Sequence, residues 1–577
     1  MTDKQSQDTE NFEIDRDGTG NAADYPWLKD YPEGVVWDQT IEPRTLFAPL
    51  DQAIQSNPAN ICTNFLGAKL TYREIGERIN HVAHGLQKLG IGKGQKVGLF
   101  LPNSPTFIIF YFAVLKIGGV VVNYNPLYAV EELEFQVRDS ETDILVTLDL
   151  KMLCDKVEAL LDTGVLKRTI VCSFADLLPG VKKLLFRLLK RSELSDLPNS
   201  PGSDKVIREA DLIANDGRFT PEDIDPHRDL AVLQYTGGTT GTPKGAMLSH
   251  ANLSINVKQI CMWATDMVEG QERVMGILPF FHVFAMTTVL NYGTTMAAEL
   301  ILMPRFDLDE AIKLINRLKP TIMPGVPTLY NAMMNHPKMA SSDFSSLKFC
   351  ISGGAALPLE VKTGFEKISG CSLVEGYGLS ETSPVATVNP MEGAVKENSI
   401  GIPVPGTIVS IRSLEDPTKE MPLGENGEIC ISGPQVMSGY WNKPEETKNS
   451  FVGEFFRTGD VGHMDDQGFT FIVDRIKDLI ISSGFNIYPR RIEEAVYEFP
   501  AVEEVTVVGI ADERRGEAPK AFIKLKPGQQ ATSKEIMEFL EPKLSNLEIP
   551  AEIEFREELP KTIIGKLSKK ELRAEAE

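Results

Sequence analysis

Apolar runs rich in β-branched residues alternate with helix-like stretches through the first two-thirds of this 577-residue chain. The runs lie at 96–102 (KVGLFLP), 120–126, 143–148, 168–173, 347–354 and 371–378. Strands and helices that alternate in this way are typical of layered α/β domains with largely parallel sheets. A chain of this length is also too long for one hydrophobic core, so two or more domains are expected.

The pattern changes twice toward the C-terminus. From about 400, short strand-like runs separated by turn residues predict a small β-rich subdomain over about 400–474. After 475 a compact stretch has the pattern helix, strand, strand, helix, which predicts a small α+β domain, and we place the boundary in DRIKDLI (474–480). The predicted organisation is an acidic disordered tail over 1–24, a large N-terminal domain over 25–474 and a small C-terminal domain over 475–577.

Composition excludes several classes of protein. A net charge of −22 argues against bulk nucleic-acid binding, which needs a basic surface. The seven cysteines include no C-x-x-C pair and the seven histidines no H-E-x-x-H, so we expect buried free thiols and no catalytic zinc. The polar N-terminus does not resemble a signal peptide, and the longest apolar run, 107–115, is too short to span a bilayer. We expect a cytoplasmic protein.

The stretch YTGGTTGTPKG (235–245) has the composition of a phosphate-binding loop. Glycines allow a ligand to approach the backbone N–H groups, threonines add hydroxyl donors and Lys244 adds a positive charge. The stretch follows the apolar run 230–235, so we expect a strand, the loop, and then a second strand or turn that leads into a helix. It is not a Walker A loop, because Lys244 lies between Pro243 and Gly245. The alternative is a flexible surface loop.

Three later motifs complete a candidate nucleotide site. EGYGLSETSP (375–384) offers Tyr377 as a flat ring for a base and Glu381 as a carboxylate for Mg²⁺ carried by phosphates. FRTGD ends in Asp460, and a hairpin that turns at DDQG is expected to bring Arg475 back toward it, where the two side chains suit ribose hydroxyls. LPKTIIGKLSKKEL (559–572) places Lys566 after a glycine. Each residue alone would be an ordinary turn or surface charge.

Taken together, these motifs resemble the signatures of the adenylate-forming superfamily of acyl-CoA synthetases, luciferases and adenylation domains. YTGGTTGTPKG, LPFFHVFA (278–285), GYGLSETSP, GEICISGPQVMSGYW (427–441), FRTGD, DRIKD and PKTIIGK occur in the family's order, over about 45–572. The resemblance implies that a carboxylate attacks the α-phosphate of MgATP to give acyl-AMP and pyrophosphate, and that a thiol, usually that of CoA, then displaces AMP. The implied cofactors and co-substrates are therefore ATP, Mg²⁺ and CoA.

The resemblance also implies roles for individual residues. Nucleotide-binding positions are Thr236, Gly237, Gly238, Thr239, Thr240, Gly241, Lys244, Gly354, Gly376, Tyr377, Gly378, Thr382, Asp460 and Arg475. Glu381 with Thr236 resembles the Mg²⁺ site, and Lys566 the lysine that bridges the carboxylate and the α-phosphate. The small C-terminal domain rotates between the two steps in this family, so Lys477 matches the hinge, near 475–478. Gly484 matches a glycine on the CoA-side face.

Among relatives, the chain is most similar to bacterial long-chain fatty acyl-CoA synthetases. It shares with them a glycine at position 237 and a similar sequence over 456–481. The expected acyl pocket comprises His282, Phe284, Gly325 and Val326, although such apolar runs are often simply core. Alternatives are a medium-chain or aryl (4-coumarate-like) CoA ligase, a carrier-loading acyl-AMP ligase and an inactive lipid-binding scaffold. Retention of both Glu381 and Lys566 counts against the scaffold. A homodimer is a further possibility.

One segment, LLPGVKKLLFRLLKRSEL (177–194), is basic and rich in Leu and Phe at helical spacing. The simpler expectation is a surface helix that packs its leucine face on the core. The alternative is an interfacial helix that contacts an anionic membrane, as expected if the substrate is a lipid. Neutralising Lys182, Lys183, Arg187 and Lys190 would distinguish the two.

Overall fold

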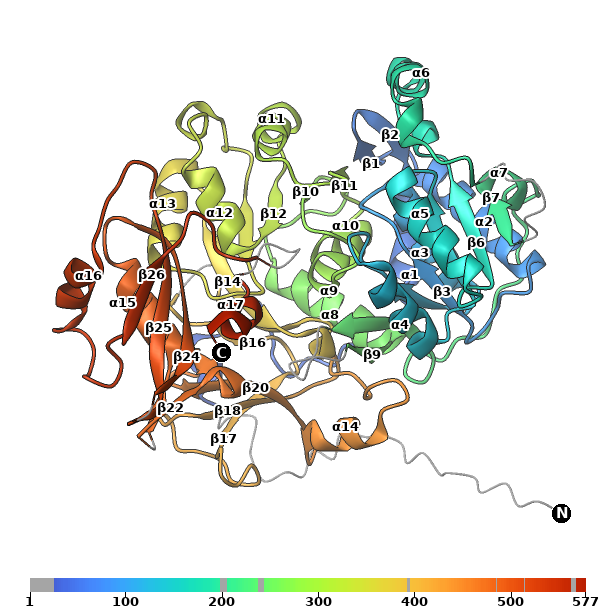
Figure 1. Ribbon diagram of the computed structural model, residues 1–577. Coiled ribbons are helices and arrows are strands. Elements are labelled where there is room, and N and C mark those ends of the chain that lie inside the picture. Colours follow the sequence, from blue (N-terminus) through green and yellow to red (C-terminus); the bar gives the residue numbers. More distant parts are fainter. Residues whose placement is uncertain are drawn as a thin grey trace.

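The computed structural model describes residues 25–197, 205–236, 243–391, 395–483, 485–512, 514–561 and 567–576. Figure 1 shows the α/β architecture that the sequence predicts, with three sheets in the larger part and a fourth near the C-terminus. The predicted tail over 1–24 lies outside the described residues.

The first large sheet has seven strands in the order β7-β6-β5-β3-β4-β8-β9. All neighbours pair in parallel except β8 and β9, which form an antiparallel pair from Leu230↔Ser249 to Thr236↔Lys244. The strands are β3 Lys96–Leu99, β4 Val120–Asn123, β5 Ile144–Leu148, β6 Arg168–Cys172, β7 Val206–Arg208, β8 Leu230–Thr236 and β9 Lys244–Ser249. The associated helices are α2 Tyr72–Lys88, α3 Pro105–Lys116, α4 Val130–Ser140, α5 Lys151–Asp162, α6 Gly180–Leu189 and α7 Glu209–Leu212. The strands that flank the predicted phosphate loop are therefore confirmed.

The second large sheet has nine strands in the order β16-β15-β14-β13-β12-β10-β11-β1-β2. Its centre, from β14 to β1, is parallel and both edges are antiparallel. The strands are β1 Ile61–Phe65, β2 Ala68–Thr71, β10 Arg273–Gly276, β11 Glu299–Leu302, β12 Ile322–Gly325, β13 Phe349–Ser352, β14 Leu373–Gly378, β15 Val385–Val388 and β16 Ile402–Pro403. The associated helices are α1 Ala48–Ser56, α8 His250–Trp263, α9 Val283–Ala285, α10 Tyr292–Thr295, α11 Leu308–Leu318, α12 Pro327–Met334 and α13 Leu359–Ser369.

The longest apolar run of the sequence forms α3, which is buried along its whole length where the two large sheets meet. The Ser104 hydroxyl caps the helix by accepting a hydrogen bond from the N–H of Phe107. Phe107 packs edge-on against Phe280 after β10, and Tyr111 accepts a hydrogen bond from Asn291. A helix with no polar face is stable here because α2, β3, β4 and the segments after β10 cover it. Within the described ranges, no helix is both long and apolar enough to cross a bilayer.

The third sheet is antiparallel and contains β17 Ile408–Arg412, β18 Gly427–Ser432, β19 Phe451–Val452, β20 Phe455–Met464 and β21 Thr470–Arg475, with α14 Pro444–Asn449 beside it. The β20–β21 turn is held by Asp465, whose carboxylate accepts hydrogen bonds from the N–H groups of Gln467 and Phe469. Gly468 has φ +82°, which glycine adopts without strain. The hairpin brings Arg475 directly opposite Asp460, as the sequence predicts.

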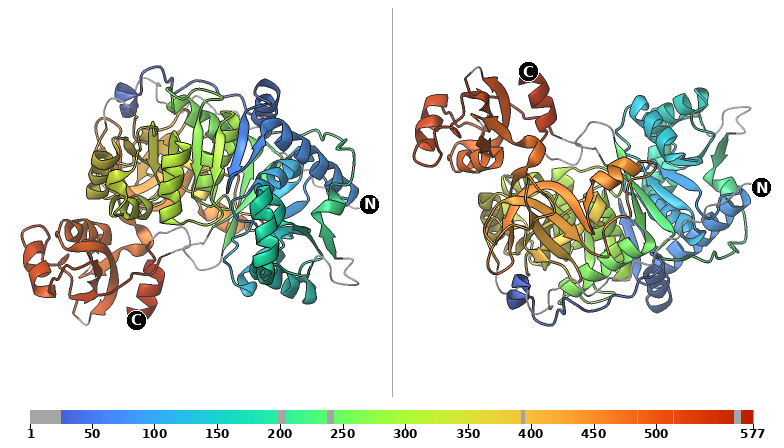
Figure 2. Two further views of the ribbon diagram at one scale, coloured as in Figure 1. Left: turned by 90° about the horizontal axis from the view of Figure 1, so that it is seen from above. Right: turned by 90° about the horizontal axis from the view of Figure 1, so that it is seen from below.

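The fourth sheet belongs to the C-terminal part, which has its own core. Its strands are β22 Ile480–Ser482, β23 Phe485–Ile487, β24 Val502–Asp512, β25 Gly516–Leu525 and β26 Glu552–Phe555, and its helices are α15 Pro489–Tyr497, α16 Ser533–Leu540 and α17 Lys569–Ala576. Ile492, Val507, Ile523 and Ile536 form a hydrophobic cluster distinct from that of the larger part. Figure 2 shows this part standing beside the rest of the molecule.

The basic segment 177–194 is not packed as the simpler expectation has it, with its leucine face on the core. It forms α6, and no residue of this helix is fully buried. Leu177 and Leu178, which precede the helix, are buried. The expectation that the leucine face of the helix packs on the core is wrong, because the four leucines of α6 are exposed and Phe186 is the residue of α6 that packs against the core.

All seven cysteines are free, as expected, with six buried and Cys261 half-buried.

Candidate active site

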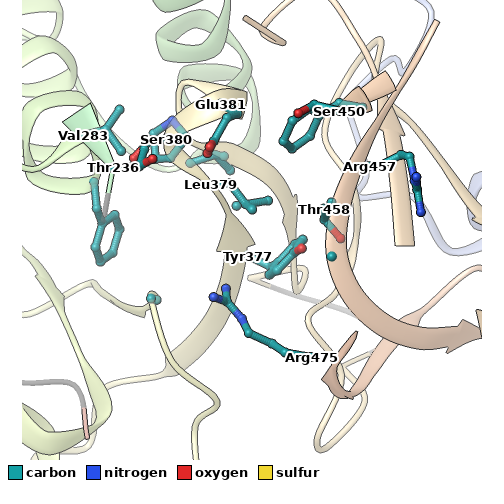
Figure 3. A pocket seen from close by; sticks show the side chains of 18 of the residues that line it. Thr236, Val283, Tyr377, Leu379, Ser380, Glu381, Ser450, Arg457, Thr458 and Arg475 are labelled. Atoms are coloured by element: carbon teal, nitrogen blue, oxygen red, sulfur yellow. The ribbon is translucent and has the colours of Figure 1, made fainter. Parts of the chain in front are cut away.

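A pocket of about 520 Å³ lies where the two large sheets, the antiparallel sheet and the segment after β21 converge. Its wall is formed by Thr236, Lys244, His282, Val283, Phe284, Ile351, Gly353, Gly354, Gly376, Tyr377, Gly378, Leu379, Ser380, Glu381, Pro384, Val385, Glu428, Tyr440, Asn449, Ser450, Phe456, Arg457, Thr458, Gly459, Arg475, Ile476 and Lys477. Figure 3 shows Glu381, Ser380 and Thr236 at one end and Tyr377 with Arg475 at the other. The pocket therefore brings together residues from six of the motifs that the sequence analysis identified.

Glu381 is a buried carboxylate held by a tyrosine. It lies in the short 3-10 turn Ser380–Thr382 after β14, and it accepts a 2.8 Å hydrogen bond from the hydroxyl of Tyr440. Burial raises the pKa of Glu381, while Tyr440, Arg475 and Lys244 oppose that rise. Lys244 Nζ lies 5.3 Å above the Tyr440 ring. This end of the pocket thus combines one carboxylate with one lysine cation.

Tyr377, Asp460 and Arg475 form a second cluster at the other end. The Tyr377 hydroxyl donates a 2.6 Å hydrogen bond to Asp460 Oδ2, and Arg475 Nε lies 2.8 Å from Asp460 Oδ1. Asp460 is almost fully buried, whereas the Arg475 side chain is half-exposed toward the pocket. Asp460 raises the pKa of Arg475, so the ion pair is maintained. A ring, a carboxylate and a guanidinium in this arrangement offer a stacking surface beside acceptors and donors for hydroxyl groups.

An ion pair with a buried carboxylate supports strand β20 just before Asp460. Arg457 donates through Nε to Glu428 Oε2 at 2.9 Å, and the N–H of Gly459 donates to Glu428 Oε1 at 3.1 Å. Only 2 % of the Glu428 side chain is exposed, so both carboxylate oxygens are committed to these contacts. Glu428 therefore fixes the backbone just before Asp460.

Glycines let the backbone approach closely on the remaining side. A Cβ at Gly378 would lie 1.7 Å from the carbonyl oxygen of Pro384, so no side chain fits there. Gly354 has φ +81° and lines the pocket. Beside Gly353, the ring of Phe284 forms an apolar wall, and the N–H of Phe284 donates a hydrogen bond to His282 Nδ1. These glycines leave space beside the ends of β13 and β14.

A small apolar cavity of about 30 Å³ adjoins this wall and shares Ile351 and Val385 with the pocket. Its lining includes Trp263 of α8, Tyr292 of α10 and Met391 after β15. The space behind this wall is therefore lined mainly by apolar side chains.

The sequence-predicted residues fall into three groups. Thr236, Lys244, His282, Phe284, Gly354, Gly376, Tyr377, Gly378, Glu381, Arg475 and Lys477 line the pocket. Asp460, Thr382, Gly325 and Val326 do not line it, although Asp460 contacts Tyr377 and Arg475 directly. Gly237, Gly238, Thr239, Thr240, Gly241, Gly484 and Lys566 lie outside the described residues.

The predicted site residues that do not line the pocket are held by nearby contacts. Thr382 is fully buried and accepts a hydrogen bond from the N–H of Leu379, so it holds the turn that carries Glu381. A Cβ at Gly325 would meet Leu329 and Tyr330 of α12, and Val326 is the buried residue that precedes that helix.

Lys477 lies at the junction with the C-terminal part, in the 3-10 turn Ile476–Asp478. Burial lowers the pKa of its ammonium group, and Asp478 opposes that change. The junction is tied to the C-terminal helices, because Arg573 of α17 lies 2.8 Å from Asp478 and the N–H of Arg490 donates to Asp474.

Sequence reasoning missed Tyr440 and Glu428. Both lie within 427–441, a segment used only as a family signature, and an aromatic after Ser-Gly was the available signal for Tyr440. Their contacts join residues 59 and 31 positions apart, to Glu381 and Gly459.

Comparisons with known proteins identify the family to which this chain belongs. The family model "AMP-binding enzyme" matches residues 50–441, and "AMP-binding enzyme C-terminal domain" matches 491–566. A long-chain-fatty-acid–CoA ligase of Bacillus subtilis (strain 168) is 43% identical over 547 residues, covering 95% of this chain and 97% of its own. A feruloyl-CoA synthase of Amycolatopsis sp. is 33% identical, covering 88% and 94%.

Among solved structures, ATP-bound MatB from Rhodopseudomonas palustris is similar with a TM-score of 0.80 and 28% identity, covering 92% of this chain and 99% of its own. The similarity thus extends over nearly the whole length of both chains, including the C-terminal part. The chain belongs to the AMP-binding enzyme family.

Proposed function

We propose that this protein is a long-chain fatty acid–CoA ligase that works in two steps. A fatty acid and ATP give acyl-AMP and pyrophosphate, and CoA then takes the acyl group as a thioester and releases AMP. The observation that carries the proposal is a pocket with a carboxylate and lysine at one end and an aromatic–carboxylate–guanidinium cluster at the other, adjoined by a small apolar cavity. The similarity to a long-chain-fatty-acid–CoA ligase over 95% of the chain supports the substrate class.

The cluster around Asp460 suits the nucleoside. The face of Tyr377 offers a stacking surface for adenine, and its hydroxyl keeps Asp460 in place. Asp460 and Arg475 together supply an acceptor and donors for the two ribose hydroxyls. Because their pairing is fixed by the β20–β21 register, the site is preorganised before the nucleotide binds.

The opposite end suits the phosphates and Mg²⁺. Lys244, with the loop that follows Thr236, would bind phosphate oxygens. Glu381 and Thr236 would hold Mg²⁺, which favours one or two protein oxygens together with phosphate oxygens and water. No cluster of three His, Cys, Asp or Glu side chains that could hold a metal occurs in the described part of the chain, and this donor set needs none. When bound, the ion would neutralise charge on the phosphates.

In the first step a carboxylate oxygen of the fatty acid bonds to the α-phosphorus as the bond to the pyrophosphate oxygen breaks. We infer from the sequence that Lys566 neutralises the charge that accumulates as two anions meet. In the second step the CoA sulfur, after losing its proton, bonds to the acyl carbon and AMP leaves. We place the hinge between the two steps at 475–478 with Lys477, and we place Gly484 on the face that admits the thiol.

The acyl chain is proposed to pass between His282 and Phe284 toward the apolar cavity beside Ile351 and Val385. That cavity is small, so a long chain requires the side chains around it to move. Because the pocket wall does not include Gly325 and Val326, their proposed role in chain binding depends on such a movement.

A second candidate is an aryl-CoA ligase, which the 33% identity to a feruloyl-CoA synthase favours. Such an enzyme would use the same nucleotide residues and differ only in the shape of the acyl pocket.

The proposal is tested by measuring AMP and thioester formation from ATP, Mg²⁺ and CoA with palmitate, decanoate or 4-coumarate. Palmitate-dependent AMP with palmitoyl-CoA is the expected result. Preference for 4-coumarate would instead establish the aryl ligase. AMP without a CoA thioester would indicate a carrier-protein acceptor, and no AMP with any acid would contradict the proposal.

A further inference from the structure

Helix α6 presents an aliphatic face to solvent. Val181, Leu184, Leu185, Leu188 and Leu189 are 75%, 60%, 48%, 69% and 74% exposed. Their spacing of i, i+3, i+4, i+7 and i+8 places all five on one side of a helix. Figure 1 shows α6 projecting beyond the β1–β2 end of the molecule. Exposed apolar side chains are usually scattered, whereas these form one continuous stripe.

The opposite face attaches the helix to the protein and fixes its rotation. The ring of Phe186 lies 5.0 Å from that of Phe174. Lys183 and Arg187 both reach Asp176, at 2.7 and 2.9 Å. Lys182 Nζ donates a 2.7 Å hydrogen bond to the carbonyl oxygen of residue 66. Because these contacts all come from one side, the aliphatic stripe is directed away from the protein.

The segment is also locally basic in an acidic protein. Residues 180–191 contain five basic side chains and no acidic one, whereas the whole chain carries a net charge of −22. Lys190 pairs with Glu193 at 2.5 Å, so the positive charge is only partly neutralised nearby. Such a difference orients the molecule with α6 toward a negatively charged surface.

We propose that α6 docks this protein on an anionic lipid bilayer, with its aliphatic stripe inserted at the boundary between headgroups and acyl chains. Interfacial helices of this kind insert about 5–10 Å and combine apolar burial with attraction to anionic lipids. A second copy of the chain fits this face less well, because a symmetric contact would bring two basic helices together.

The experiment is vesicle co-sedimentation of the full chain without ATP, CoA or acid, so its outcome does not depend on the proposed reaction. Vesicles of phosphatidylcholine alone are compared with vesicles that contain phosphatidylglycerol. The test variant is Val181→Ser/Leu184→Ser/Leu188→Ser. The matched control, Val36→Ser/Leu127→Ser/Leu423→Ser, replaces three side chains outside α6 that are 53%, 57% and 56% exposed.

We expect the native chain to bind phosphatidylglycerol vesicles at least about tenfold more strongly than phosphatidylcholine vesicles. The α6 triple variant should lose about tenfold or more of that binding, and the control triple variant should retain it. A variant that neutralises Lys182, Lys183, Arg187 and Lys190 should bind both vesicle types alike. Circular dichroism melting identifies any variant that fails to fold, and Leu188→Ser alone then replaces the triple variant.

Three results would overturn the proposal. The first is native protein that binds neither kind of vesicle, and the second is an α6 variant that binds as the native chain does. The third is a native dimer in sedimentation velocity that the α6 variant dissociates, since the stripe would then be an interface between copies of the chain.

Discussion

The Tyr377 hydroxyl donates a 2.6 Å hydrogen bond to Asp460, although the two residues are 83 positions apart. The same carboxylate holds Arg475 at 2.8 Å. Asp460 therefore connects the proposed base-stacking ring to the proposed ribose clamp.

Replacing Asp460 with Asn keeps the shape but removes the charge that pairs with Arg475. Loss of a charge-assisted contact costs about 1.5–3 kcal/mol, so kcat/KM for ATP should fall roughly 10- to 150-fold. Steady-state kinetics with ATP varied checks this, and Asp466→Asn, in the exposed hairpin turn, is the matched control. Unchanged ATP kinetics in Asp460→Asn would remove the residue from the site.

Tyr440→Phe deletes the 2.8 Å hydrogen bond to Glu381. Burial already raises the pKa of Glu381 and the tyrosine opposes that rise, so the variant should have a still higher pKa there. Because the carboxylate form binds Mg²⁺, the acidic limb of the pH–activity profile should move to higher pH. The profile is measured at low and saturating Mg²⁺, with Tyr128→Phe as control. A shift toward lower pH would contradict the proposed role.

Glu375, buried within β14, should make stability depend on pH. Burial raises the pKa of its carboxyl from the ordinary value of about 4.5 to about 7, and Arg490 opposes that rise. The unfolded chain then ionises first, so stability falls as pH rises from about 4.5 through 7. Glu375→Gln keeps an acceptor for the N–H of Leu357 and removes this loss. We expect the variant to be more stable than the native chain by about 3 kcal/mol at pH 8 and equal to it at pH 4.

Denaturant unfolding at the two pH values tests this, with the exposed Glu425→Gln as control. Equal differences at pH 4 and pH 8 would show that the carboxyl does not titrate as proposed.

The sequence predicted some features of the fold and of the site, but not others. The alternation of apolar runs predicted the parallel sheets, and the DDQG turn predicted the Asp460–Arg475 register, because both depend on local patterns. The Tyr440–Glu381 contact was missed because it joins two loops whose approach depends on the packing of separate sheets. The leucines of α6 were predicted to form one face, but periodicity does not say whether that face points inward.

Lys566→Ala should lower the rate of acid-dependent AMP formation at least about 100-fold, since a positioned cation contributes several kcal/mol at such a site. Lys570→Ala, an exposed lysine of α17, should leave the rate unchanged. A Lys566→Ala variant that remains active would mean that another lysine has this role.

Gly484→Leu should separate the two half-reactions. A bulky side chain on the proposed CoA-side face blocks the thiol, so palmitoyl-AMP should form at the native rate while palmitoyl-CoA formation falls about 100-fold or more. Single-turnover assays with and without CoA measure both rates. Equal loss of both rates would refute the assignment.

The central claim, that a fatty acid is activated through acyl-AMP, is tested most directly with palmitate labelled with ¹⁸O in its carboxylate. The native chain is incubated with labelled palmitate, ATP, Mg²⁺ and CoA, and AMP is analysed by mass spectrometry. The proposed mechanism predicts one ¹⁸O atom in each AMP, because the attacking carboxylate oxygen stays on phosphorus when the thiol displaces AMP. Unlabelled AMP, or ADP and phosphate in its place, would contradict it.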